Sequence, residues 1–321
     1  MSKEIWIVNI AEGSEMSREF KSLVAKGQKL AKDAGYKLCC VILGSAARER
    51  SGSCMVWADK IYCVHTAEAE SQGSAAYTKT LEMMAGKYQP EIMLFTTERI
   101  SNVISASLGI RLDTGVVAHS GDFRIEKGLL ISSIPTYGGQ AIGDIFCKGK
   151  LPQIASAKVQ TAQPEEHDFP AEYVLEKCVL DEKCTVKLVS LERREDERVR
   201  IEDADVIVCA GFGIKNRENW KKIKLLAKRL GGEAACTRSG IKIADVAEED
   251  YLIGVSGKTV APRAYIGFGV SGSTQHICGM SESKIVININ TNDGNSFFET
   301  SDYGYVGDAE DILNQLINQT N

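Results

Sequence analysis

The stretch AYIGFGVSGSTQHICGM, residues 264–280, decides the fold of the second half of the chain. Its aromatic and β-branched start predicts a short buried strand, its glycines predict a tight loop, and Ser273 with Thr274 can begin a helix. Such a loop offers free backbone N–H groups, which bind an anion such as phosphate. The spacing G-x-G-x-x-G also occurs in ordinary turns, so the loop alone leaves a plain turn and a phosphate site equally open.

The rest of the second half alternates buried strands with helices. We expect strands at 204–210, 234–236, 251–255, 264–269 and 284–290, and helices at 217–230 and 310–317. Ligands bind along the carboxyl ends of strands in an open parallel sheet, and polar side chains follow these strands. The expected site therefore includes the hydroxyl, amide and basic groups of Thr237, Arg238, Ser256, Ser271, Ser273, Gln275, His276, Asn288 and Asn290.

The first half also alternates strands and helices, which predicts a parallel sheet with both faces covered. Strands are expected at 5–10, 38–43, 60–64 and 92–96, with helices at 17–34, 75–87 and 101–108. Five short strands between 115 and 158 would extend this sheet with antiparallel additions, and one more strand is expected at 185–192. The charged run at 193–198 predicts a linker. We therefore expect two α/β domains, at 1–195 and 196–321.

Composition excludes several classes of function. The 38 basic and 43 acidic residues offer no basic stripe for nucleic acid, and no apolar run reaches the length of a membrane span. A strand is expected directly at the N-terminus, which predicts a cytoplasmic protein without an export signal. Most of the ten cysteines lie in apolar runs without metal-ligand spacing, so we expect reduced, buried thiols and no metal.

The polar set suits a nucleotide, but two readings of it stay open. The position about 20 residues past the glycine loop, where an acid often binds the ribose of NAD, is Asn290. No nucleophile lies near a base in the sequence, so no catalytic residue is predicted. Arg238 could instead form a surface ion pair, and His276 could cap its own backbone. One reading is a site that only binds a nucleotide, and the alternative is an NAD-dependent oxidoreductase or a nucleotide-binding transferase.

Four segments resemble the alpha subunit of electron transfer flavoproteins. They are GVSGKTVAPRAYI at 254–266, GVSGSTQH at 269–276, SKIV at 283–286 and SDYGYVGD at 301–308, with weaker likenesses at 202–208 and 138–141. The resemblance implies a Rossmann-like C-terminal domain that binds FAD, and an N-terminal domain that contacts a beta subunit. It implies an electron carrier rather than an enzyme, with an acyl-CoA dehydrogenase or another flavoenzyme as redox partner. If the beta subunit held a second FAD, electron bifurcation would be a further branch.

The resemblance also assigns roles to residues. It implies that 271–276 wrap the nucleotide, that Arg238 lies near the flavin ring, and that 253–256 approach the ring at its N5 and O4 side. His276 would reach the pyrimidine edge of the ring. The implied FAD set is Thr237, Arg238, Ile253, Gly254, Val255, Ser256, Ser271, Gly272, Ser273, Thr274, Gln275 and His276, with Asn290, Asp308 and Ala309 at the adenosine end.

Two positions of the expected site depart from the family pattern, one in the turn at 211–213 and one within this set. Phe212 replaces an arginine and Val255 replaces a glutamine, whereas Thr237 and Ser256 keep the usual hydroxyl. Each loss could remove a hydrogen bond worth roughly 0.5 to 3 kcal/mol. We therefore expect altered FAD affinity or potential, and a scaffold whose flavin site has decayed is a third reading.

Overall fold

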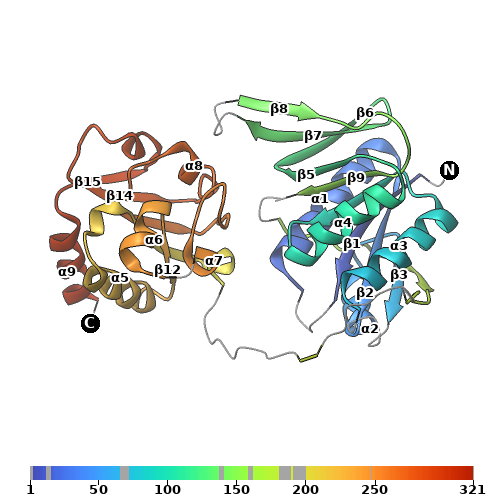
Figure 1. Cartoon of the computed structure of the whole chain (residues 1–321), viewed down its shortest axis with the longest axis horizontal. Helices are drawn as coiled ribbons and strands as arrows, with labels where there is room; N and C mark the ends of the chain where they lie inside the picture. The colour runs from blue at the N-terminus through green and yellow to red at the C-terminus, as the bar shows by residue number, and fades with distance from the viewer. Residues whose placement is uncertain are drawn as a thin grey trace. The chain divides into compact units, whose positions relative to one another are not determined.

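The computed structural model describes residues 3–11, 16–65, 72–136, 141–157, 162–180, 189–190, 200–246 and 248–320. The chain forms two compact units (Figure 1). Unit 1 comprises Met1–Pro135 and Ile142–Arg193, and unit 2 comprises Thr136–Ala141 and Arg194–Asn321. Each unit is built on a parallel sheet, so the predicted α/β fold with two domains is confirmed.

Unit 1 contains a seven-stranded sheet in the order β10-β3-β2-β1-β4-β9-β5, and each of its pairings is parallel. Its strands are β1 (Glu4–Ile10), β2 (Lys37–Gly44), β3 (Lys60–His65), β4 (Ile92–Thr96), β5 (Val116–Ser120), β9 (Gln153–Ala157) and β10 (Glu172–Leu175). The central strands are buried along almost their whole length, because helices cover both faces.

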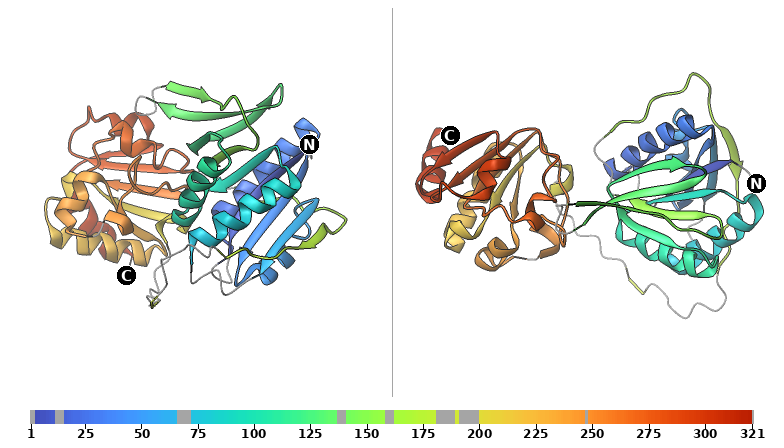
Figure 2. Two further views of the ribbon diagram at one scale, coloured as in Figure 1. Left: turned by 45° about the vertical axis from the view of Figure 1, so that its right-hand side comes forward. Right: turned by 90° about the horizontal axis from the view of Figure 1, so that it is seen from above.

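The helices of unit 1 lie on opposite faces of its sheet (Figure 2). On one face, α1 (Arg18–Ala34) and α2 (Ala47–Cys54) pack through residues such as Phe20 and Leu23. On the other face, α3 (Ser74–Tyr88) and α4 (Arg99–Arg111) pack through residues such as Leu81 and Ile104. The Ser17 hydroxyl caps α1, and Gly35 ends it in a left-handed conformation.

The strands between 115 and 158 do not all extend this sheet. β6 (Asp122–Glu126), β7 (Leu129–Thr136) and β8 (Ala141–Ile145) form a separate three-stranded sheet, so the expected extension is wrong for them. β9 and β5 do extend the sheet, but in parallel and not antiparallel as expected. Lys127 and Gly128 both have positive φ and form a two-residue turn that pairs β6 with β7 antiparallel. The strand expected at 185–192 falls almost entirely outside the described residues.

Unit 2 contains a five-stranded sheet in the order β12-β11-β13-β14-β15, again with parallel pairings. Its strands are β11 (Val206–Ala210), β12 (Glu233–Cys236), β13 (Ala264–Phe268), β14 (Val286–Asn290) and β15 (Tyr303–Val306). One face packs against the helices α5 (Arg217–Arg229), α6 (Arg238–Ala244) and α9 (Ala309–Gln319). Tyr251 of the short helix α7 (Glu248–Tyr251) packs on this same face. The other face is covered by loops and the short elements η3 (Ile201–Asp203), α8 (Thr274–Ile277) and η5 (Ser296–Thr300).

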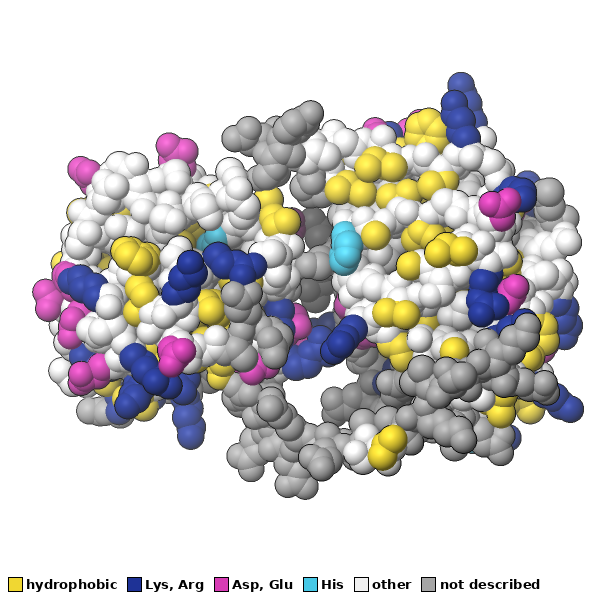
Figure 3. Space-filling model, viewed as in Figure 1, with side chains coloured by type: hydrophobic (Ala, Val, Ile, Leu, Met, Phe, Trp, Pro, Cys, Tyr) yellow, Lys and Arg dark blue, Asp and Glu magenta, His cyan; other side chains and the backbone are white. Residues whose placement is uncertain are grey.

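Helix α5 follows the predicted apolar spacing. Trp220, Ile223 and Leu226 are buried against the sheet, whereas Lys221 and Lys224 are exposed. Basic side chains gather over this helix in the space-filling view (Figure 3). The strand expected at 251–255 is wrong, because α7 extends to Tyr251. The two residues that follow make isolated bridges instead.

Candidate functional site

The strands of unit 2 end at one edge of the sheet, where the predicted site residues follow them. The chain passes from β11 to β12 on one side and then to β13 on the other, so the direction reverses between β11 and β13. Open α/β sheets bind ligands at such a reversal. The turn η4 (Phe212–Ile214) and the loop after β13 meet here, since the Gly213 N–H donates to the Gly269 carbonyl over 3.1 Å.

The glycines of the G-x-G-x-x-G loop serve packing within the protein. A Cβ on Gly267 would lie 2.9 Å from the Phe297 ring, and one on Gly272 would lie 2.5 Å from the Phe297 backbone. A Cβ on Gly269 would collide with the Gly213 backbone. These three glycines therefore leave room for η4 and η5.

The loop at 270–273 is held by its carbonyl groups. The Val270 carbonyl accepts from the side-chain amides of Asn290 (2.9 Å) and Asn295 (3.1 Å), and the Ser296 hydroxyl contacts the carbonyls of Ser271 and Gly272. By contrast, the backbone N–H groups of residues 271–275 have no acceptor among the described residues. Five consecutive free N–H groups next to a left-handed Gly272 fit an anionic group such as a phosphate.

Arg238 and Ser256 come together although 18 positions separate them. The Arg238 Nη2 donates to the Ser256 Oγ over 2.6 Å, and both side chains are exposed. Thr237 is buried, and its hydroxyl accepts from the Gly240 N–H over 3.1 Å, so it caps α6. The cap fixes the start of α6 and with it the position of Arg238.

The loop at 253–256 lies against α8. The Val255 N–H donates to the Gln275 carbonyl over 2.8 Å, and a Cβ on Gly254 would lie 2.8 Å from the same oxygen. Ile253 is buried, whereas the Val255 side chain is 62 % exposed. The structure thus brings 253–256 and 271–276 together, as the predicted site requires, and leaves the Val255 side chain at the rim.

His276 is buried, with both ring nitrogens occupied. Its Nδ1 lies 3.1 Å from the Ile253 carbonyl and its Nε2 lies 2.7 Å from the Tyr265 hydroxyl. Burial lowers the pKa of His276 to about 4, although the Ile253 carbonyl raises it in part. The imidazole is therefore neutral at pH 7, and both of its nitrogens have partners within the protein.

The predicted adenosine-end residues lie at the far strands of the sheet. Asn290 ends β14, and its Oδ1 accepts from the Asn292 N–H. Asp308 caps α9 through the Glu310 N–H (2.8 Å) and pairs with Lys215 (2.5 Å), which lowers the pKa of the Asp308 carboxyl. Ala309, the next residue, is buried.

These positions span the sheet from β12, before Arg238, to β15, before Asp308. Four strand spacings amount to about 19 Å. An extended dinucleotide such as FAD fits this length. The backbone N–H groups of 271–275 lie in the middle of this edge, and the Arg238 cation lies at one end. No sequence pattern indicates three supporting residues, Asn295, Ser296 and Lys215, because each contacts a segment distant in sequence.

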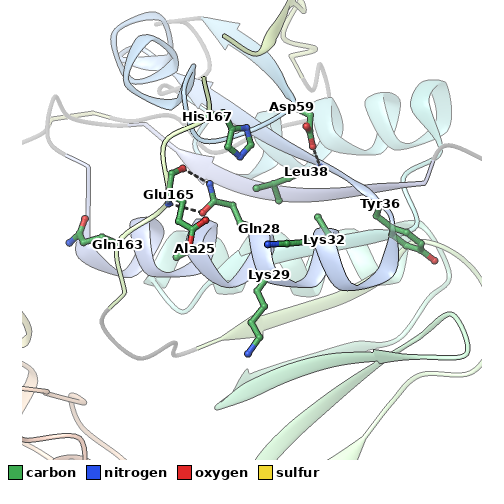
Figure 4. Close-up of a pocket in the computed structure, with 11 residues that line it drawn as sticks. Ala25, Gln28, Lys29, Lys32, Tyr36, Leu38, Asp59, Gln163, Glu165 and His167 are labelled. Atoms are coloured by element: carbon green, nitrogen blue, oxygen red, sulfur yellow. Dashed lines mark hydrogen bonds between the residues drawn. The ribbon is translucent and has the colours of Figure 1, made fainter. Parts of the chain in front are cut away.

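A cavity of ≈ 530 Å³ lies elsewhere, in unit 1 (Figure 4). Lys29 and Lys32 of α1 line it together with Glu165 and His167 from the segment that crosses this helix. The Gln28 side chain links α1 to two other segments, since its Nε2 donates to the carbonyls of Trp57 and Glu165. The cavity adjoins the start of β2, the edge opposite to the carboxyl ends of the strands, and belongs to a different unit from the predicted site.

Two features are absent from the described residues. None of the helices there is both long and apolar enough to cross a membrane. Within the same part of the chain, no three side chains of His, Cys, Asp or Glu lie together in a way that could hold a metal ion.

Comparison with known proteins matches both halves of the chain. Residues 5–179 match the electron transfer flavoprotein domain, and residues 200–281 match the electron transfer flavoprotein FAD-binding domain. The chain is 29 % identical to the Protein FixB of Clostridium saccharobutylicum, over 99 % of this chain and 96 % of that protein. It is also 29 % identical to the electron transfer flavoprotein subunit alpha of Thermoanaerobacterium thermosaccharolyticum, over 99 % and 97 %.

A third relative, the electron transfer flavoprotein subunit alpha of Megasphaera elsdenii, is 28 % identical over 91 % of this chain and 88 % of its own length. The family match covers more than half of the chain, and its second part falls on the sheet edge described above. The chain therefore belongs to the electron transfer flavoprotein family, and its C-terminal part is the FAD-binding domain of that family.

Proposed function

We propose that this chain is the alpha subunit of an electron transfer flavoprotein and holds FAD along the carboxyl edge of the unit 2 sheet. The observation that carries the proposal is the run of backbone N–H groups at 271–275 that find no acceptor within the described part of the chain, set between Arg238 and Asn290 on the same edge. FAD would supply one- and two-electron redox chemistry, and the protein would supply binding and electrostatics.

Each part of the edge would have its own task. The N–H groups of 271–275 would bind the pyrophosphate, and Asn290, Asp308 and Ala309 would border the adenosine. Arg238, oriented by Ser256, would place a cation beside the ring, where it favours added negative charge and raises the potential. The exposed Phe212 and Val255 carry no donor, which supports an affinity or potential unlike that of relatives with arginine and glutamine there.

The partners follow from the same proposal. Residues 1–195 would contact a beta subunit, and residues 196–321 would hold the FAD. The heterodimer would carry electrons between an acyl-CoA dehydrogenase or another flavoenzyme and an acceptor, in the cytoplasm and without substrate turnover of its own. A bifurcating complex would need a second FAD in the beta subunit and NADH as the donor.

An absorbance spectrum tests the proposal. The chain, co-expressed with its beta subunit, should purify with flavin bands near those of free FAD and release FAD on denaturation. Failure to take up added FAD would contradict it and favour the decayed scaffold, whereas binding of NAD in place of FAD would favour the oxidoreductase. FAD content per heterodimer, one or two, then decides whether the bifurcating branch is tenable.

A further inference from the structure

Basic residues collect on helix α5 of unit 2. Between positions 215 and 229 the sequence has seven lysines and arginines and one acidic residue, Glu218, although the whole chain has a formal net charge of -5. An ordinary solvated helix mixes the two signs, because opposite charges three or four positions apart stabilise it. The charges are therefore segregated, and α5 presents a positive surface on a negatively charged protein.

Four of the seven basic side chains have partners within unit 2. The contacts are Lys215 with Asp308, Lys222 with Glu310, Arg217 with Asp245, and Arg229 with the Ile317 carbonyl. These partners belong to α9, to the residue that caps α9 and to the residue that ends α6. The fold of unit 2 itself therefore accounts for these four basic residues.

The other three, Lys221, Lys224 and Lys228, are exposed, and none of them has an ion pair or hydrogen bond within the described part of the chain. Their spacing of three and four positions places them in one row along the outer face of the helix. Leu225 lies within this row, four positions after the first lysine and three before the last, and it is 41 % exposed. These four residues, which we call the lysine row, combine three unpaired cations with one apolar side chain.

The stability of the helix does not account for the lysine row. Lys224 lies three positions after Lys221 and four before Lys228, and like charges at these spacings destabilise a helix. Lys228 lies in the last turn, where the helix dipole favours a cation, but the other two lysines lie before it. A negatively charged surface outside the chain would turn this repulsion into attraction.

We propose that the lysine row is a docking surface for an acidic patch on another protein, with an apolar side chain of that patch against Leu225. The row is about 10 Å long at 1.5 Å per residue, which matches a local patch of charge. A net charge of -5 opposes approach to the continuous negative charge of a nucleic acid or an anionic membrane, whereas a local acidic patch can meet the row alone. An apolar centre beside charged groups is also typical of protein interfaces.

This contact goes beyond the proposed function, because it uses the outer face of a helix and not the edge of the sheet where FAD would lie. Its main effect would be on association: complementary charges steer two proteins together and raise the rate of encounter more than they raise affinity. The steering should weaken as salt shortens the Debye length from about 30 Å at 0.01 M to about 8 Å at 0.15 M.

Fluorescence anisotropy with a labelled acidic peptide tests the proposal on the heterodimer of this chain and its beta subunit. The peptide consists of glutamates around one leucine, and a second peptide has glutamines in place of the glutamates. The triple variant Lys221→Gln, Lys224→Gln and Lys228→Gln should bind the acidic peptide about tenfold more weakly at low salt and should lose most of the salt dependence. The matched control changes three exposed lysines elsewhere, Lys37→Gln, Lys177→Gln and Lys284→Gln, and should bind as the wild type does.

Leu225→Gln tests the apolar part: it should weaken binding of the leucine-containing peptide by a few fold and leave the salt dependence unchanged. Equal binding by the two triple variants, or equal binding of the acidic and glutamine peptides to the wild type, would overturn the proposal. Tighter binding of duplex DNA or of phosphatidylglycerol vesicles than of the acidic peptide would also overturn it. FAD uptake should be the same in every variant, so a failure of the docking surface is distinct from a failure of the proposed function.

Discussion

Arg238 is the cation of the proposed site, and its guanidinium donates to Ser256. Arg238→Ala should weaken FAD binding by roughly tenfold, the effect of losing about 1.4 kcal/mol, and should lower the flavin potential. Fluorescence titration and a spectroelectrochemical titration measure the two effects. Lys242→Ala, which removes an exposed cation from the last turn of the same helix, is the control. Equal behaviour of the two variants would remove Arg238 from the site.

His276 should make stability depend on pH. Its pKa is about 4 in the folded state, below the ordinary value of 6.5, so the unfolded chain binds more protons between these values. Its contribution to the free energy of unfolding is complete above pH 6.5 and is lost as the pH falls toward 4. Between pH 7 and 4.5 the loss should be about 2.5 kcal/mol.

Urea unfolding of wild type and His276→Asn at both pH values measures this loss. The variant lacks the buried ring, so its stability should fall less on acidification than that of the wild type. An equal fall in the two proteins would show that the ring titrates normally in the fold.

Asn288 is completely buried on β14, and neither its Nδ2 nor its Oδ1 has a partner among the described residues. Its cross-strand neighbours are Gly267 and Gly304. An unsatisfied buried amide costs about as much as its packing contributes, so Asn288→Ala should change the free energy of unfolding by less than about 1 kcal/mol. Ile289→Ala, the next residue, should cost about 2 to 5 kcal/mol.

Native-state hydrogen exchange at the β14 amides compares these two variants directly. A large loss in Asn288→Ala would mean that the amide has a partner, such as a buried water, and would assign it a structural role.

At the scale of elements, the loop after β13 depends on its fit against η5. Gly272 has a φ of +72°, and a Cβ there would lie 2.5 Å from the Phe297 backbone. Gly231 has a similar φ of +68°, but nothing lies within 4 Å of a Cβ there. Gly231→Ala should therefore cost about 1 to 2 kcal/mol from backbone strain alone. Gly272→Ala should cost more and should also weaken FAD binding.

Thermal unfolding together with FAD titration separates backbone strain from the clash with Phe297. Both variants have the strain, but only Gly272→Ala has the clash. If Gly272→Ala were as stable as Gly231→Ala and bound FAD normally, the loop would not need η5 for its shape.

The elements differ in how far the sequence could predict them. Helices with a clear apolar face, such as α1 and α5, were predicted within a few residues, because burial repeats along their length. β15 was missed since its four residues are all exposed, which gives no alternation to detect. The segment at 251–255 looked like a buried strand because Leu252 and Ile253 are buried, yet they make isolated bridges.

At the scale of the whole molecule, FAD should stabilise one unit selectively. The proposed site draws its residues from unit 2. FAD at a concentration of 100 times its dissociation constant should therefore raise the free energy of unfolding of that unit by about 2.7 kcal/mol. Hydrogen exchange with and without FAD should slow at strands β11 to β14 and stay unchanged at strands β1 to β4 of unit 1. Equal protection of both units would mean that FAD binds elsewhere or joins them.

The location of the candidate site can be predicted from the sequence, but the hydrogen bonds of its residues cannot. Strand ends in a parallel sheet must meet at one edge, so Arg238, Ser256 and the loop at 271–276 could be grouped from the sequence. Which hydroxyl caps a helix and which nitrogen holds a proton depend on neighbours distant in sequence. Thr237 and His276 therefore have partners within the protein that no spacing indicated.

The segment after β14 matters for engineering, because residues on both sides of it contact a loop that is distant in sequence. Residues 291–294 are exposed and end at a glycine, the usual features of a loop that accepts inserted sequence. Yet Asn290 on one side of it and Asn295 on the other both donate to the Val270 carbonyl, and the Ser296 hydroxyl contacts the carbonyls of Ser271 and Gly272 in the loop after β13. An inserted tag or a change of length here would break these hydrogen bonds. The open turn at Gly231 is the safer site for a label or a fusion.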